Sequence, residues 1–368
     1  MQYTEYGKTG ISLSRIGFGC MRFEDHTDRE KSAALILEAY DRGINYFDTA
    51  PYYCEDQSQD IVGLALKEMK KTRREKPFYV STKTSEKDPD KIRRDLEKSL
   101  DRLGLDAIDF YHVWCVMTRD DWASRKLAGV LEQFEKLKEE GLIKNICVST
   151  HMSGEDIGSM LDDYPFAGML MGYSIMNFPF REKGIAAAAE RGMGLSIMNP
   201  LGGGIIPQFP DRFSFVKTRE DESTIEAALR FLLNDRRITL ALVGFSNSEH
   251  IETACRAIDG YQPIPEPEIE RIKGGLNNSF NSLCTGCCYC DDCPVDLPIP
   301  RLMDAYNHFV LTGDKTAAHD RMKWHWGVAN PAVAEGCIDC GQCEDACTQK
   351  LDIRNRLNWV HEMLKQSA

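Results

Sequence analysis

The stretch FYVSTKTSEKDPDKIRRDLEKSLDRLGLDAIDFYHV, residues 78–113, holds the pattern that decides the fold. It opens with a short apolar run at Phe78–Ser81, continues through an amphipathic stretch at Lys91–Leu103, and closes with a second apolar run at Ile108–Val113. Short apolar runs predict buried strands, and an apolar periodicity near 3.6 residues predicts a helix. The stretch therefore predicts one strand–helix–strand unit whose two strands run parallel.

The same alternation extends in both directions from this unit, from Ile16 to Val243. We count eight such units, which predict an α/β fold of the (β/α)8 TIM-barrel type. An open, doubly wound parallel sheet would alternate in the same way, but no G-x-G-x-x-G run opens the first helix. Strands are expected at Ile16–Gly19, Tyr46–Asp48, Phe78–Ser81, Ile108–Val113, Asn145–Ser149, Met169–Tyr173, Gly194–Met198 and Leu240–Val243.

Two segments outside the repeated units mark the ends of the barrel. Tyr3–Ser14 has turn residues at Gly7 and Gly10 between extended residues, which predicts a hairpin that closes the bottom of the barrel. Gln262–Pro267 contains three prolines, so we expect an extended connector there. The predicted domains are a barrel over residues 1–262 and a smaller C-terminal domain over residues 263–368.

The predicted C-terminal domain is rich in cysteine. Of the 14 cysteines in the chain, eight form two tight runs, Cys284, Cys287, Cys290, Cys293 and Cys337, Cys340, Cys343, Cys347. A cubane iron-sulfur cluster takes one thiolate on each iron, and close spacing lets one loop supply most of them. The second run has the bacterial ferredoxin spacing, and Pro294 follows the first run as in that pattern. We therefore expect two [4Fe-4S] clusters in a small, mainly α-helical, ferredoxin-like domain.

Structural zinc and disulfide bonds are the alternatives for these cysteines. C-x2-C pairs also suit tetrahedral zinc, and disulfide scaffolds are also cysteine-rich. Two runs of four cysteines favour iron over zinc, while disulfide scaffolds are usually short, secreted chains. By the ferredoxin rule the fourth cysteine of each run serves the other cluster, which predicts the sets Cys284, Cys287, Cys290, Cys347 and Cys337, Cys340, Cys343, Cys293.

Composition restricts the partners and the compartment. The formal net charge is -12, which argues against nucleic acid and anionic membranes as partners, because binding to both relies on clustered Lys and Arg. The first residues lack the apolar stretch of a signal peptide, and no later segment approaches the roughly 18 apolar residues that span a bilayer. We expect a reduced, cytoplasmic, soluble protein.

Short motifs at the predicted strand ends give a more specific indication. Asp48-Thr49-Ala50 is followed by Tyr53, Ser81-Thr82-Lys83 ends the third strand, and Asn199–Gly204 follows the seventh. Barrel enzymes build their active sites at these C-terminal strand ends. With these motifs and the cysteine runs in place, the sequence resembles the aldo/keto reductases, specifically the branch that carries a ferredoxin-like C-terminal domain.

The resemblance implies a carbonyl-reducing site. Family members use a tyrosine as the acid, and a lysine paired with an aspartate lowers the pKa of its phenol. By match to the motifs these residues are Tyr53, Lys83 and Asp48. The family's histidine is replaced by Trp114, so His112 is the remaining candidate, which either substitutes for that histidine or fills the barrel.

The resemblance also implies a cofactor site at the strand ends. Leu170 stands where the family has a glutamine, and His250 stands where an arginine often meets the ribose 2′-phosphate. NAD(P)H therefore competes with a flavin as the expected cofactor, since a flavin can split two electrons into the single electrons that clusters carry. The matching residues are Gly19, Cys20, Met21, Ser149, Asn199, Pro200, Leu201, Gly202, Gly244 and Ser246.

Two functions are consistent with these residues. The first is an oxidoreductase acting on a small carbonyl or alcohol substrate, whose clusters pass electrons to or from a ferredoxin-like carrier. The second is a barrel that is non-catalytic or does not use nicotinamide, with structural clusters. The presence of both Asp48 and Lys83 favours the first, because a buried charge is costly unless it is paired or useful.

Overall fold

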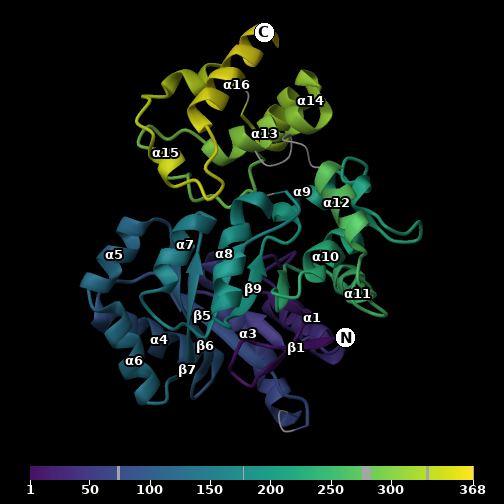
Figure 1. Ribbon diagram of the computed structural model, residues 1–368. Helices are drawn as coiled ribbons and strands as arrows, with labels where there is room; N and C mark the ends of the chain where they lie inside the picture. The colour runs from purple at the N-terminus through teal and green to yellow at the C-terminus, as the bar shows by residue number, and fades with distance from the viewer. Residues whose placement is uncertain (73–74, 177, 276–282, 329–330, 368) are drawn as a thin grey trace. The chain divides into compact units, whose positions relative to one another are not determined.

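The computed structural model describes residues 1–72, 75–176, 178–275, 283–328 and 331–367. Eight parallel strands close into a barrel in the order β10-β3-β4-β5-β6-β7-β8-β9, which confirms the TIM barrel and excludes the open sheet (Figure 1). Pairing of Ala241 with Ile16 closes the ring. The strands are β3 Ile16–Gly19, β4 Tyr46–Asp48, β5 Tyr79–Thr84, β6 Ile108–Val116, β7 Ile143–Thr150, β8 Gly168–Gly172, β9 Gly194–Met198 and β10 Leu240–Val243.

A hairpin precedes the barrel, as expected from the turn residues. Strands β1 Tyr3–Glu5 and β2 Ser12–Ser14 pair antiparallel, and Tyr6, which follows β1, is fully buried. A Cβ atom at Gly168 or Gly194, where β8 and β9 begin, would lie within 2.4 Å of the Tyr6 side chain. Because only glycine leaves room for this ring, the tyrosine fills the N-terminal end of the barrel.

Amphipathic helices cover the outside of the strands (Figure 1). Helix α4, Pro89–Leu103, illustrates why they form where they do: the Asp88 side chain accepts hydrogen bonds from the first turn, and Gly104 ends the helix with φ 62°. The other covering helices are α1 Arg29–Asp41, α3 Ser58–Met69, α5 Arg119–Leu127, α6 Val130–Glu139, α7 Gly154–Leu161, α8 Phe178–Glu190, α10 Thr224–Asn234 and α11 Ser248–Arg256.

The chain divides into two compact units, and the division differs from the boundary expected at residue 262. The first unit comprises Met1–Leu201 and Val216–Ile269, and the second comprises Gly202–Phe215 and Glu270–Ala368. Helix α12, Glu266–Gly275, begins inside the proline-rich segment. An extended connector over all of that segment is therefore wrong, because Pro267 lies in the first turn, where a helix does not need its missing N–H.

The second unit has its own core. Helices α13 Ile299–Thr312, α14 Lys315–Asp320 and α16 Ile353–Ser367 bury a cluster that includes Leu302 and Val360 together with the thiol of Cys347. Five further cysteines of the two runs pack against the same cluster, namely Cys284, Cys290, Cys293, Cys337 and Cys343. Across the described ranges, no helix is both long enough and apolar enough to cross a membrane.

Candidate active site

A buried ion pair lies at the C-terminal ends of two neighbouring strands. Asp48 is the last residue of β4, and Lys83 lies near the end of β5. The Lys83 Nζ atom is 2.8 Å from Asp48 Oδ1 and 2.6 Å from Oδ2, and the Lys83 side chain is fully buried. Ser81 donates a further hydrogen bond to Asp48 Oδ1. Ser81 is part of the Ser81-Thr82-Lys83 motif, but the sequence alone does not predict its contact with Asp48, because that contact depends on the register of β4 and β5.

The pair keeps Lys83 charged. Burial disfavours the ammonium form, but the adjacent Asp48 carboxylate outweighs burial and raises the pKa of Lys83. Breaking a buried pair by removing one partner typically costs about 3–5 kcal/mol, because it leaves an uncompensated charge. The site therefore holds a buried lysine ammonium, balanced by the Asp48 carboxylate, at the C-terminal end of the barrel.

Tyr53 lies beside this charge. Lys83 Nζ is 5.3 Å from the centre of the Tyr53 ring, and the Trp114 ring meets Tyr53 edge-on with centroids 5.7 Å apart. Burial raises the pKa of Tyr53, whereas the Lys83 charge acts in the opposite direction. The net pKa is raised rather than lowered, so the phenol stays protonated near neutral pH. The neighbouring Tyr52 is 67% exposed, which supports the choice of Tyr53 from its spacing to Asp48.

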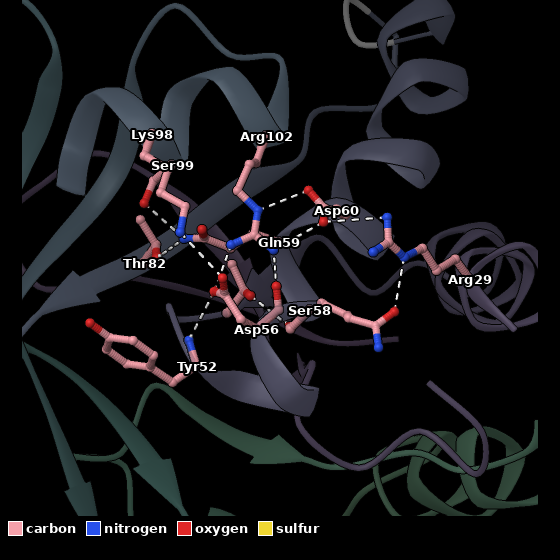
Figure 2. Close-up of polar contacts among 12 residues, drawn as sticks. Arg29, Tyr52, Asp56, Ser58, Gln59, Asp60, Thr82, Lys98, Ser99 and Arg102 are labelled. Carbon is pink, nitrogen blue, oxygen red and sulfur yellow. Dashed lines mark hydrogen bonds and ion pairs between the residues drawn. The ribbon is translucent and has the colours of Figure 1, made fainter. Parts of the chain in front are cut away.

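The backbone around Tyr53 is strained. Tyr52, Cys54, Glu55 and Asp56 have φ angles between 53° and 69°, and none of them is glycine. A left-handed backbone costs such residues roughly 1–2 kcal/mol each. Figure 2 shows the contacts around this turn, in which Arg102 reaches from α4 to Asp56. The sequence gives little signal for this turn, because only Asp56 among its positive-φ residues is of a type that favours positive φ.

His112 is buried on the strand next to Lys83. It pairs in register with Lys83 across β5 and β6, is fully buried, and has no hydrogen-bond partner for either ring nitrogen among the described residues. Burial and then the charge of Lys83 lower the pKa of His112 to about 3. The imidazole is thus neutral near neutral pH. It can accept or donate a hydrogen bond there but cannot act as an imidazolium acid.

The predicted cofactor residues lie at the C-terminal ends of four strands or on the loops that follow them. After β3, Cys20 is buried and Met21 is 43% exposed, while Gly19 ends the strand itself. After β10, Ser246 donates a hydrogen bond of 2.8 Å to the carbonyl of Arg22, which ties this loop to the one after β3. A Cβ atom at Gly244 would lie 2.8 Å from the Arg22 side chain.

The remaining cofactor candidates belong partly to the first unit and partly to the second. Ser149, near the end of β7, is 1% exposed, and its hydroxyl has no hydrogen-bond partner in the described parts of the chain. Asn199, Pro200 and Leu201 follow β9 within the first unit, whereas Gly202 opens the segment assigned to the second. In that segment a Cβ atom at Gly203 would lie 2.0 Å from the carbonyl oxygen of Thr285. Chain packing therefore accounts for one glycine of the run without a pyrophosphate.

Within the second unit the cysteines fall into two neighbourhoods. Burial, and also the proximity of Cys287 and Cys347, raise the pKa of Cys284 to about 12, and Asn307 hydrogen bonds to both the amide and the carbonyl of Cys284. Separately, one small hollow is lined by Cys293, Cys337, Cys340 and Cys343. Within the described ranges, no group of three His, Cys, Asp or Glu side chains is arranged to hold a metal ion.

Comparisons with known proteins identify the barrel. The aldo/keto reductase family model matches residues 15–276. A probable aldo-keto reductase 1 of Glycine max is 27% identical over 77% of this chain and 84% of its own length. An NADH-specific methylglyoxal reductase of Escherichia coli is 28% identical over 56% of this chain and 69% of its own.

The fold comparison agrees with the sequence comparisons. The apo form of aldo-keto reductase AKR11C1 from Bacillus halodurans superposes with a TM-score of 0.62 at 25% identity, covering 75% of this chain and 96% of that one. With the family model spanning the barrel and its strand-end motifs, the chain is an oxidoreductase that belongs to the aldo/keto reductase family.

Proposed function

We propose that the barrel reduces a small carbonyl compound to its alcohol, with Tyr53 as the proton donor. The observation that carries this proposal is the buried Lys83–Asp48 pair beside the Tyr53 ring. A reduced nicotinamide would supply the hydride to the carbonyl carbon. The carbonyl oxygen then takes the Tyr53 proton, so one hydride and one proton convert the carbonyl into an alcohol.

The protonation state of Tyr53 suits the role of proton donor. Because the pKa of Tyr53 is raised by burial, the phenol carries its proton near neutral pH and can donate it. Lys83 stabilises the phenolate that forms, and Asp48 balances the lysine charge when the substrate is absent. His112 would supply a neutral hydrogen bond within the same end of the barrel, and Trp114 would restrict substrate size.

A nicotinamide would give a hydrogen-bond partner to one buried hydroxyl of the barrel. The buried Ser149 hydroxyl lacks a partner among the described residues and would hydrogen bond to the carboxamide of the cofactor. Gly19, Cys20 and Met21, with Gly244 and Ser246, would line the rest of the cofactor on their two linked loops. Asn199, Pro200 and Leu201, which follow β9 in the same unit, would complete this lining.

We further propose that residues 263–368 hold two [4Fe-4S] clusters. One would be bound by Cys284, Cys287, Cys290 and Cys347, and the other by Cys293, Cys337, Cys340 and Cys343. In support, Cys287 and Cys347 act on the pKa of Cys284, and the other four cysteines line one hollow. A cubane spreads its ligands over four irons, so its thiolates lie farther apart than those around a single ion.

The clusters would exchange single electrons with a ferredoxin-like carrier. The side chain of Ile338 beside Cys337 is 60% exposed, and Cys340 is also exposed. A cluster bound there would lie near the surface of its unit, within reach of a docked protein. The proposed hydride step does not involve the clusters or the carrier. The barrel proposal and the cluster proposal can therefore be tested separately.

The barrel proposal is tested by turnover. Wild type, Tyr53→Phe and the matched control Tyr52→Phe are assayed with NADH and NADPH against a panel of small aldehydes that starts with methylglyoxal, and FMN binding is titrated in parallel. Loss of a general acid typically lowers kcat about 100- to 10,000-fold. We expect that loss only in Tyr53→Phe. Equal activity of the two variants, or FMN binding without nicotinamide turnover, would refute the proposal.

The cluster proposal is tested by metal analysis of protein purified without oxygen. Two cubanes predict about eight iron and eight sulfide per chain. Cys287→Ala should lower that content, whereas Cys288→Ala, which changes the adjacent cysteine, should not. Stoichiometric zinc in place of iron would contradict the proposal.

A further inference from the structure

The turn that carries Tyr53 is held by one arginine of a neighbouring helix. Arg102, near the end of α4, donates from Nη1 to Asp56 Oδ1 at 2.7 Å and from Nη2 to the backbone carbonyl of Asp56. It also donates from Nε and Nη2 to the two oxygens of Asp60 at 2.8 and 3.0 Å. All three guanidinium nitrogens are therefore engaged by the segment that follows Tyr53 (Figure 2).

Asp56 passes this restraint back along the turn. Its carboxylate accepts a hydrogen bond of 3.3 Å from the backbone N–H of Tyr52 and one of 3.2 Å from Lys98. The amide of Gln57 in turn donates to the carbonyl of Tyr53 at 3.1 Å. Tyr53 thus lies between the N–H of Tyr52, which bonds to the Asp56 side chain, and the carbonyl of Asp56, which accepts from Arg102. Both groups are therefore connected to α4.

The far end of the turn is anchored separately. Ser58, the first residue of α3, donates to the carbonyl of Cys20 at 2.6 Å and contacts the Thr49 hydroxyl at 2.7 Å. Gln59 bonds to Thr82 and Ser99, each at 2.9 Å. These contacts fix where α3 begins, but none of them touches residues 52–56, four of which have positive φ angles. Residues 52–56 are instead restrained at Asp56 by Arg102 and Lys98. Two weaker contacts add to this: Cys54 Sγ donates to the carbonyl of Cys20 at 3.7 Å, and exposed Glu55 lies 3.5 Å from His26.

We propose that Arg102 is a positioning residue, which sets Tyr53 against Lys83 by holding the left-handed turn Tyr52–Asp56. The inference rests on the proposed role of Tyr53 as the acid. Arginine suits this task because its planar fork engages a carboxylate and a carbonyl in one fixed geometry, whereas the ammonium of lysine is a point charge on a flexible stem. Without the fork, the turn relaxes toward right-handed backbone and Tyr53 shifts away from its position.

The test compares Arg102→Met with the control Arg93→Met. Arg93 lies in the same helix as Arg102 but away from the turn, and its Nη2 atom donates to both carboxylate oxygens of Glu140. A displacement near 1 Å costs about 100-fold in rate, so we expect kcat of Arg102→Met to fall roughly 10- to 100-fold with little change in KM. Amide hydrogen exchange over residues 52–57 should accelerate in Arg102→Met. Arg93→Met should change neither quantity.

A rescue experiment separates positioning from general stability. Glycine adopts a left-handed backbone without the steric cost of a side chain, so Glu55→Gly in the Arg102→Met background should restore part of the lost kcat. Glu55 is exposed and is not part of the proposed catalytic group. If Arg102→Met does not fold, Asp56→Asn weakens the same contact with a residue that tolerates positive φ, and faster exchange over 52–57 is again expected.

The outcomes distinguish this inference from the function on which it rests. Unchanged exchange over 52–57 in the folded variant, or unchanged kcat in Arg102→Met when Tyr53→Phe is inactive, overturns the positioning role alone. If Tyr53→Phe is as active as wild type, the proposed acid is wrong, while the exchange measurement still reports whether Arg102 holds the turn.

Discussion

The barrel site and the cysteine region are held in place in different ways. In the barrel, Asp48 and Lys83 neutralise each other at hydrogen-bond distance on rigid strands. In the cysteine region, residues 283–298 contain no helix or strand, and Cys284 depends on contacts such as those from Asn307. The difference teaches that the first site is organised by the protein alone, whereas the second would gain order from whatever its thiols bind.

The largest expected effect follows from breaking the buried pair. Lys83→Met leaves Asp48 buried without its cation, so the free energy of unfolding should fall by about 3–5 kcal/mol. The loss of the charge beside Tyr53 should also lower kcat by about 100-fold or more. Denaturant unfolding and steady-state kinetics measure the two effects. Stability and kcat close to wild type would show that the barrel site is not organised by this pair.

Removing iron should affect the second region and spare the first. Chelation of anaerobic protein should make residues 283–298 and 337–352 roughly tenfold or more sensitive to protease, because metal binding contributes folding free energy there. The barrel should keep its melting temperature and its circular dichroism. Limited proteolysis with mass analysis reads out the cleavage sites, and equal cleavage before and after chelation would remove the contrast between the regions.

A smaller effect is expected from the pH dependence of stability. His112 has an ordinary pKa of 6.5 and a folded pKa of about 3, so the unfolded chain binds a proton that the folded chain refuses between these values. The contribution of neutral His112 to the free energy of unfolding is therefore intact above pH 6.5. It is lost as pH falls toward 3, by up to about 1.4 kcal/mol per pH unit. His112→Asn should show a shallower decline in unfolding free energy between pH 7 and 4.5. An identical decline would contradict neutral burial of the imidazole.

Sequence reasoning located the barrel well because its signals are local. Four predicted strands, including Ile16–Gly19 and Gly194–Met198, match the observed bounds, since an apolar run between turn residues admits few other readings. Strand β8 is shifted by one residue, and strands β5, β6 and β7 differ by a few residues at their ends, where polar side chains such as Lys83 continue the strand into the site. Polar residues at the active end therefore hide the strand termini.

The features that sequence reasoning missed depend on tertiary contact. Apart from Asp56, the left-handed turn at Tyr52–Asp56 uses residues with no preference for positive φ, and it persists because Arg102, about 50 positions later, holds it. The grouping of Gly202–Phe215 with the second unit likewise has no signal in its own residues. Proline at the start of α12 misled because the same residue suits both a connector and a first helical turn.

The most direct test of the account is the pH dependence of kcat for aldehyde reduction by wild-type protein. A tyrosine acid whose pKa is raised above 10.0 predicts constant kcat from about pH 6 to pH 9, with a fall only at more alkaline pH as the phenol loses its proton. A fall centred near pH 6 to 7 would contradict the account, because it would assign the proton to a group such as histidine rather than to Tyr53.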